Sequence, residues 1–265
     1  MLTRRHWLAA TAAAACLTAG TARSHAADPN VLWRIVHSQC VPHQAQFGVP
    51  IPCTAVNRAG GYAILKDIEG ATQFLLIPTA RVTGIEDPAI LAPGAPNYWQ
   101  AAWASINLVQ AEADRALPRE DLSLAINSVR GRTQNQLHIH IDCIRADVRD
   151  ALREHAAEIG DSWAPFALPL AGHPYQAMRV ETLDRPGATP FQLLADRLPG
   201  ARADMKDETL IAVGATFPDG EPGFYLLASR ADLATGNRGE AEELQDHSCA
   251  VKSSLTARSA QNPSP

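Results

Sequence analysis

The stretch QLHIHIDC, residues 136–143, decides what the sequence implies about the fold. Leu137, Ile139 and Ile141 alternate with polar residues, which is the period of a half-buried β-strand. Side chains two residues apart lie on the same face of a strand, so the apolar set is expected to face the core. The sequence therefore predicts a strand over 136–143 that presents four polar groups on one surface: Gln136, His138, His140 and Asp142.

The neighbouring segments predict more of the same sheet. Residues 121–127 alternate as a second half-buried strand, and a polar loop, 128–135, joins it to the first. Residues 61–81 contain two apolar runs around a polar turn, which indicates a β-hairpin. Apolar residues at three-to-four spacing over 97–116 predict an amphipathic helix.

The second half of the chain is expected to contain helices and a hairpin like those of the first half. A helix from about Arg145, closed by Gly160, is expected before the Pro-rich connector 163–174. A helix over 190–198 and a second hairpin over 210–230 follow. The run Phe224–Arg230 echoes Phe74–Arg81, which indicates a duplicated unit, and residues 237–247 are expected to form a Glu-rich helix. The fold class predicted is α+β, with antiparallel sheets, packed helices and two similar halves in one chain.

The first 26 residues have the form of an export signal: a short basic start, an Ala-rich apolar run and a small-x-small site before Ala27. The protein is therefore expected in the periplasm or on the periplasmic face of the inner membrane, with the segment either cleaved or kept as an anchor. Four parts are predicted: the signal 1–26, a first half 27–162, a second half 163–250 without a His-x-His strand, and a disordered tail 251–265.

Composition excludes several classes of protein. The chain has 46% hydrophobic and 19% charged residues, which argues against a coiled coil or a disordered polymer. It carries 23 basic and 28 acidic residues without a Lys/Arg block, so it lacks the electrostatic footprint of a nucleic-acid-binding protein. An anionic substrate must instead meet positive charge confined to a site.

The cysteines predict disulfides. Four of the five lie beyond the export signal, and an even number in an oxidising compartment favours two bridges with three possible connectivities. The preferred pairing is Cys40–Cys53, across a short Pro-containing loop, and Cys143–Cys249, which would tie the end of the chain to its middle. Their spacing is unlike that of a zinc knuckle.

Three interpretations of the paired histidines remain open. One imidazole can attack a phosphoanhydride as a nucleophile and form a covalent intermediate. Alternatively, His138 and His140 are ligands of a metal in a metal-dependent hydrolase. In the third interpretation they are strand residues without a role. The adjacent loop supplies Arg132 and Thr133, which suit an anionic oxygen, and so it favours the nucleophile over the metal.

The motif QLHIHID resembles the histidine-triad motif, His-x-His-x-His with two further residues, with Gln136 in place of the first His. Together with Leu32-Trp33, Cys40, 61–67, Pro96-Asn97, 123–145 and the ending EELQDHSC, it resembles the bacterial CDP-diacylglycerol pyrophosphatase family over residues 31–250. The resemblance implies a histidine-triad-like fold and hydrolysis of CDP-diacylglycerol, a lipid at a membrane surface, to CMP and phosphatidate. A non-catalytic nucleotide-binding protein of the same fold is the alternative.

The resemblance also implies roles for particular residues. His138 maps to the nucleophile and His140 to the group that holds the phosphate, while Gln136 would lie on the leaving-group side and cannot deliver a proton. Such a site needs no metal or other cofactor. Further contacts to the phosphates are expected from five polar side chains: Asn127, Thr133, Arg132, Lys66 and Arg81.

Overall fold

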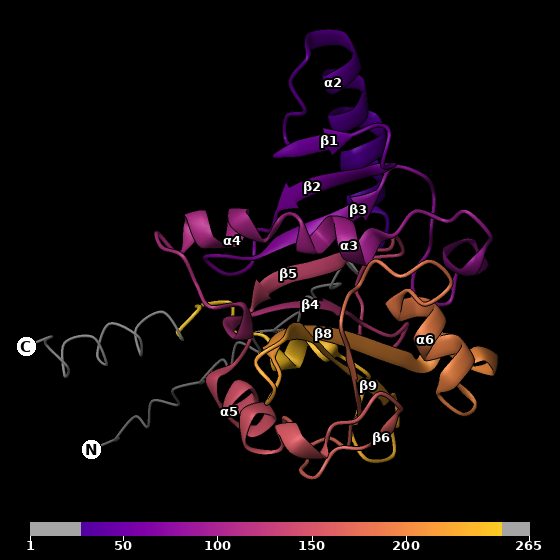
Figure 1. Ribbon diagram of the computed structural model, residues 1–265. Coiled ribbons are helices and arrows are strands. Elements are labelled where there is room, and N and C mark those ends of the chain that lie inside the picture. The colour runs from indigo at the N-terminus through magenta and orange to yellow at the C-terminus, as the bar shows by residue number, and fades with distance from the viewer. Residues whose placement is uncertain (1–27, 251–265) are drawn as a thin grey trace, which may run out of the picture.

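The described residues, 28–250 of a computed structural model, build one nine-stranded antiparallel sheet (Figure 1). The strand order is β1-β2-β3-β5-β4-β8-β9-β7-β6. The predicted export signal and tail lie outside the described residues. The strands are β1 (Ala55–Asn57), β2 (Tyr62–Lys66), β3 (Phe74–Pro78), β4 (Leu122–Ile126), β5 (Ile139–Cys143), β6 (Ala164–Pro165), β7 (Gln176–Val180), β8 (Glu208–Thr216) and β9 (Pro222–Arg230).

Helices cover both faces of this sheet, which confirms the α+β class. A π-helical segment, Val36–Cys40, joins the first two helices into one continuous rod. The α-helices are α1 (Val31–Ile35), α2 (Val41–Phe47), α3 (Tyr98–Trp103), α4 (Ile106–Glu112), α5 (Ala146–Glu154) and α6 (Pro190–Arg197). No helix within residues 28–250 is long and apolar enough to cross a bilayer.

The alternation of the strands sorts their side chains into separate cores. On one face, α3, α4 and α6 pack on the largest apolar cluster, which includes Ile139 and Ile141. On the other face, α1 and α2 cover β2 and β3, while α5 covers β8 and β9. Cross-strand partners share a face. His140 pairs with Leu75 of the first small cluster and Ala125 of the second, so the histidine strand lies between these two clusters.

Most predicted elements of the first half are present, with two corrections. The hairpin 61–81 is β2–β3, and residues 121–127 and 136–143 contain β4 and β5. The helix predicted over 97–116 is broken between α3 and α4, where Ser105 Oγ donates to Ala101 O. Gly160 does not close α5, because that helix ends at Glu154 and Gly160 is not among the glycines with a positive φ.

The Glu-rich helix predicted over 237–247 is wrong. Only residues 241–244 form a short helical turn. Gly236 and Gly239 both have a positive φ, which a continuing helix does not allow. Asn237 turns its side chain back on the chain, where Oδ1 accepts from Gly239 N and Nδ2 donates to Ser229 Oγ. These local bonds compete with the helix, and the segment takes an irregular course in which only the turn 241–244 is helical, in contact with β4 and β8.

The two predicted halves merge into one sheet through β4 and β8. Reading outward from this junction, the order β4-β5-β3-β2 has its counterpart in β8-β9-β7-β6, and β1 is an additional edge strand on the first side. By this order β9 corresponds to β5, the histidine strand, and not to β3, which the match of Phe224–Arg230 with Phe74–Arg81 had suggested. The short sequence match therefore relates two strands that occupy different positions in this strand order.

Candidate active site

The two imidazoles lie side by side, as the alternation of the strand predicts. The ring centroids of His138 and His140 are 4.9 Å apart, and their planes are inclined at 65°. Both residues are nearly buried, with 7% and 5% of their surface exposed. Leu137, Ile139 and Ile141 point into the large core on the opposite face. The strand predicted over 136–143 begins at Ile139, so His140 lies on β5 and His138 directly precedes it, with the alternation of side chains kept across this boundary.

His138 has a defined tautomer. Its Nδ1 lies 2.7 Å from the carbonyl oxygen of Gln136. A carbonyl only accepts, so Nδ1 carries the hydrogen and Nε2 keeps its lone pair. Burial, and after it the nearby charge of His140, lowers the pKa of His138 to about 4, although Gln136 O and Glu242 oppose the shift. The imidazole is thus neutral at physiological pH, which a nucleophile requires.

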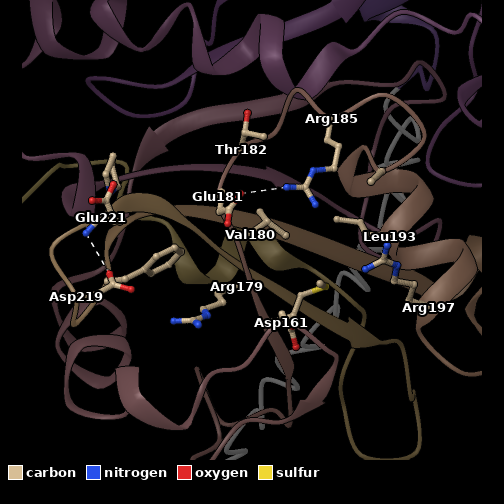
Figure 2. Close-up of a pocket in the computed structure, with 14 residues that line it drawn as sticks. Asp161, Arg179, Val180, Glu181, Thr182, Arg185, Leu193, Arg197, Asp219 and Glu221 are labelled. Atoms are coloured by element: carbon tan, nitrogen blue, oxygen red, sulfur yellow. Dashed lines mark hydrogen bonds and ion pairs between the residues drawn. The ribbon is translucent and has the colours of Figure 1, made fainter.

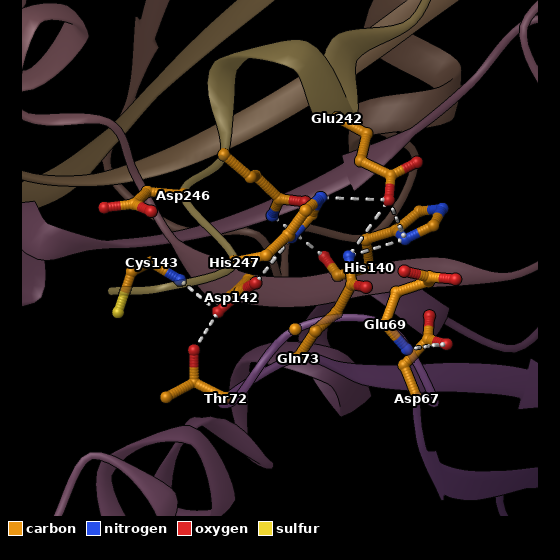
Figure 3. A network of polar contacts seen from close by, with 12 residues as sticks. Asp67, Glu69, Thr72, Gln73, His140, Asp142, Cys143, Glu242, Asp246 and His247 are labelled. Atoms are coloured by element: carbon orange, nitrogen blue, oxygen red, sulfur yellow. Dashed lines mark hydrogen bonds and ion pairs between the residues drawn. The ribbon is translucent and has the colours of Figure 1, made fainter. Parts of the chain in front are cut away.

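His140 faces a carboxylate on one side. Its Nδ1 lies 3.2 Å from Oε1 of Glu242 and 3.0 Å from Nε2 of Gln73, as the dashed lines of Figure 3 show. Its Nε2 is buried and has no hydrogen-bond partner among the described side chains. An imidazolium here would form an ion pair with Glu242 and still have Nε2–H to donate to a ligand.

Glu242 is the carboxylate that sequence reasoning missed. Asn127 holds it at two points, since its Nδ2 donates to Oε2 over 2.9 Å and its Oδ1 accepts from the Glu242 backbone N over 3.2 Å. Gln73 Nε2 donates to Oε1 over 3.1 Å. Burial alone would raise the pKa of Glu242, but His140 and these hydrogen bonds outweigh it and lower the pKa. The group is therefore ionised beside His140.

A second group of polar contacts, around Asp142, holds the C-terminal segment that carries Glu242. Asp142, fully buried, accepts from Thr72 Oγ1 over 2.6 Å and from His247 Nδ1 over 2.9 Å. The bond to Asp142 is the main cause that raises the pKa of His247. His247 Nε2 in turn lies 3.4 Å from Glu242 Oε1 (Figure 3). Asp142, predicted on the histidine face, thus anchors the C-terminal segment.

Both predicted disulfides are present. Cys40–Cys53 encloses α2 and the loop that follows it, and Cys143–Cys249 joins the end of β5 to the C-terminal segment. Asp246 N donates to Cys143 O over 2.9 Å beside the second bridge. The bridge therefore holds Glu242 and His247 against the strand that carries the histidines.

The predicted phosphate ligands are mostly occupied by other contacts. Arg132 forms a two-pronged pair with Glu86, at 2.6 and 2.7 Å, although its charge still helps to lower the pKa of His138. Lys66 Nζ donates to the carbonyls of its own turn, and Arg81 donates to Asn30 and stacks over Trp33. Thr133 is exposed. Asn127 alone of the five joins the histidines, through Glu242.

Gln136 is fully buried and its amide hydrogens are engaged. Nε2 donates to Pro78 O over 3.0 Å and to Ala80 O over 2.8 Å. These bonds fasten the residue before the histidines to the chain that leaves β3. In this arrangement Gln136 supports the strand and has no hydrogen left to offer to a leaving group.

Sequence signals for the missed residues were weak. Glu242 was placed in a helix, and Gln73 and Thr72 lie in a turn that carries no motif. The Cys143–Cys249 pairing was the one indication that the C-terminal segment returns to β5. If that bridge forms, residues a few positions before Cys249 can reach the histidine strand, and Glu242 lies seven positions before Cys249.

A cavity of about 520 Å³ lies in the part of the sheet that contains β7 and is drawn in Figure 2. Arg179, Arg185 and Arg197 line it together with carboxylates, one of which, Glu181, pairs with Arg185 at 3.1 Å. Its lining contains no histidine. The strand that carries Arg179 is four strands from β5, or about 19 Å at the spacing of a sheet, so this cavity and the histidines are separate sites.

Within residues 28–250, no three His, Cys, Asp or Glu side chains are grouped as a metal site requires. Comparison with known proteins gives a family. A family model described as CDP-diacylglycerol pyrophosphatase matches residues 27–253. A Yersinia pestis protein named CDP-diacylglycerol pyrophosphatase is 43% identical over 224 residues, which are 84% of this chain and 85% of the relative. Because both matches extend over most of its length, this chain belongs to the CDP-diacylglycerol pyrophosphatase family.

Proposed function

We propose that the protein hydrolyses the pyrophosphate bond of CDP-diacylglycerol to give CMP and phosphatidate, with His138 as nucleophile. The names of the family and of the Yersinia pestis relative supply the substrate. One observation carries the assignment of the nucleophile. The buried neutral imidazole of His138 has its Nδ1 bound to a carbonyl, which leaves the Nε2 lone pair for attack.

In the first step, His138 Nε2 attacks the cytidylyl phosphorus. A P–N bond forms, the bridging P–O bond breaks, and its electron pair leaves with phosphatidate. Phosphatidate departs as a phosphate monoester with a second pKa of about 6, so it can leave as an anion without a general acid. The reaction therefore does not need a proton from Gln136, whose amide hydrogens are already bound to Pro78 O and Ala80 O.

In the second step, water attacks the cytidylyl-histidine. The new P–O bond forms, the P–N bond breaks, and its electron pair returns to His138 Nε2 while the water proton passes to solvent. Charge that builds on the non-bridging oxygens is met by His140, whose unpartnered Nε2 would donate to them from a ring that Glu242 and Gln73 hold at Nδ1. Arg132 adds positive charge nearby.

The proposal extends to the origin of the fold and to the place where the enzyme acts. The matching strand orders of the two halves support a histidine-triad-like fold derived by duplication, in which β9 of the second half has lost the histidines. A lipid substrate places the reaction at a membrane surface. Export to the periplasm, or to the periplasmic face of the inner membrane, rests on the form of the first 26 residues.

The test is to trap the intermediate. Purified protein is mixed with CDP-diacylglycerol that carries a labelled cytidylyl phosphate, in excess chelator, and quenched with alkaline denaturant, in which a phosphoramidate survives. The wild type is expected to retain label on the protein, whereas His138→Ala is not. His155→Ala, which removes an imidazole that pairs with Glu158 on another element, serves as the matched control and is expected to retain it.

Water labelled with heavy oxygen identifies the phosphorus that is attacked. Attack at the cytidylyl phosphorus puts the label in CMP, and attack at the other phosphorus puts it in phosphatidate. Turnover that chelation abolishes but His138→Ala leaves intact would refute the nucleophile and support the metal-dependent alternative. Binding of CMP with neither turnover nor trapped label would support the non-catalytic alternative.

A further inference from the structure

Three large apolar side chains are exposed together at one end of the molecule. Phe47, Val49 and Ile51 are 61%, 47% and 63% exposed. They are three of the eight exposed large hydrophobic residues in the described part of the chain, and they fall within five consecutive positions. We call residues 47–51 the apolar tip. Single exposed apolar residues are ordinary, but a cluster of them on a protruding loop indicates an interaction site.

The apolar tip is held in place by covalent and polar contacts. Cys40–Cys53 closes the loop, and Cys53 N donates to Pro50 O over 2.8 Å. His43 Nδ1 lies 2.5 Å from Ile51 O. Gly48 ends α2 with a φ of +72°, which turns the chain sharply after Phe47. The apolar side chains are thus presented by a constrained loop and lose little conformational freedom on binding.

The region around the apolar tip carries no formal charge. From Ile35 to Asn57, 23 residues contain no Lys, Arg, Asp or Glu, in a chain of which 19% is charged. Figure 1 shows α2 and β1 projecting from one edge of the sheet, away from the centre of the fold. A charge-free apolar projection can enter hydrocarbon without the cost of burying an ion.

The apolar tip is connected to the candidate active site by one helical rod. α1 begins beside the loop that leads into the histidine strand, where Leu32 N donates to Gln134 Oε1 over 3.2 Å. The rod then crosses β3 and β2 and ends at Phe47. β1, at the base of the tip, is three strands from β5, or about 14 Å at the spacing of a sheet.

We propose that the apolar tip inserts into a lipid bilayer and docks the enzyme on the membrane that holds its substrate. This inference rests on the proposed function, which supplies a diacyl lipid as substrate. Interfacial elements enter a bilayer by about 5–10 Å, so insertion of the apolar tip would place the bilayer on the β1 side of the sheet. The lipid substrate would then be held on the side of the molecule from which the helical rod leads to the histidine strand.

Tryptophan fluorescence tests the insertion directly. The protein purified after export is mixed with phosphatidylcholine vesicles that contain no CDP-diacylglycerol and carry bromine on their acyl chains. Relative to wild type, Phe47→Trp is expected to add emission that shifts to the blue and is quenched. Leu233→Trp, at a position 57% exposed on the turn after β9, is the matched control and is expected to add unquenched emission.

A polar variant tests the contribution to binding. Replacing Phe47, Val49 and Ile51 by serine is expected to weaken partitioning into these vesicles roughly 100-fold, since each side chain would otherwise bury about half of its apolar surface. The control variant, Leu168→Ser with Leu233→Ser, is expected to bind as wild type. Equal quenching in the two Trp variants overturns the proposal, and so does unchanged partitioning of the serine variant.

These outcomes are separate from those of the proposed function. The vesicles contain no substrate, so a protein that inserts but does not hydrolyse CDP-diacylglycerol would refute the function and leave the docking intact. A protein that hydrolyses detergent-dispersed substrate but shows no insertion would do the reverse. If Phe47→Trp is not quenched and the serine substitutions dissociate a dimer, the apolar tip would instead be a contact between two copies of the chain.

Discussion

Lowering the pH from 7 to 5 is expected to leave the enzyme active, because His138 keeps its lone pair. Its pKa is lowered to about 4 by burial first and by His140 second. At pH 5 an imidazole with a pKa near 4 is about 90% neutral, whereas one with the ordinary value of 6.5 is about 3% neutral. The structure therefore predicts about 30-fold more reactive nucleophile at pH 5 than an unperturbed histidine would provide.

The same shift makes stability depend on pH. Between pH 6.5 and 4 the unfolded state binds a proton at His138 that the folded state does not, so stability rises with pH in this window. A shift of about 2.5 units corresponds to about 3 kcal/mol lost as the pH falls from 6.5 to 4. His138→Ala is expected to lose this part of the pH dependence, which urea unfolding at several pH values would measure.

The assay is kcat/KM for detergent-dispersed CDP-diacylglycerol from pH 4 to 8, with circular dichroism at each pH to verify folding. This ratio reports ionisations of the free enzyme, in which the pKa of His138 is lowered by its surroundings. The acidic limb is expected near pH 4. A limb at pH 6–6.5 in protein that remains folded would refute either the buried neutral state of His138 or its role as nucleophile.

Three other changes test the surroundings of the histidines. Glu242→Gln removes the charge-assisted contact with His140 and is expected to lower kcat about 10–100-fold with little change in KM. The control Glu240→Gln, in an exposed ion pair with Arg238, is expected to leave kcat and KM unchanged. Equal effects of the two variants would argue against a positioning role for Glu242. Glu86→Gln leaves the buried Arg132 without its anion and is expected to cost about 3–5 kcal/mol in urea unfolding. Cys249→Ser opens a loop of 106 residues and is expected to cost about 2–5 kcal/mol and most of the activity. Unchanged unfolding midpoints would contradict the last two predictions.

Local pattern determined a large part of this protein. The strand of alternating residues, the two hairpins and the helix over 190–197 follow from periodicity and turn residues. The number of cysteines predicted two disulfides, and the pairing preferred among three connectivities is the one present. The adjacency of His138 and His140 follows from the period of an extended segment. Apart from the disulfide pairing, these features need only neighbours in sequence.

Tertiary structure decided which charges face the histidines. Glu242 reaches His140 from 102 residues further along the chain, and Glu86 takes the guanidinium of Arg132 that sequence reasoning had assigned to phosphate. The segment 237–247 is rich in helix formers, yet side-chain bonds and the contacts of Asn127 and Asp142 hold it in an irregular course with a single helical turn. Contacts between segments far apart in sequence leave no periodic signal. They arise only when the sheet brings β4, β5 and the C-terminal segment together, because burial then favours hydrogen-bond partners for most of the polar groups.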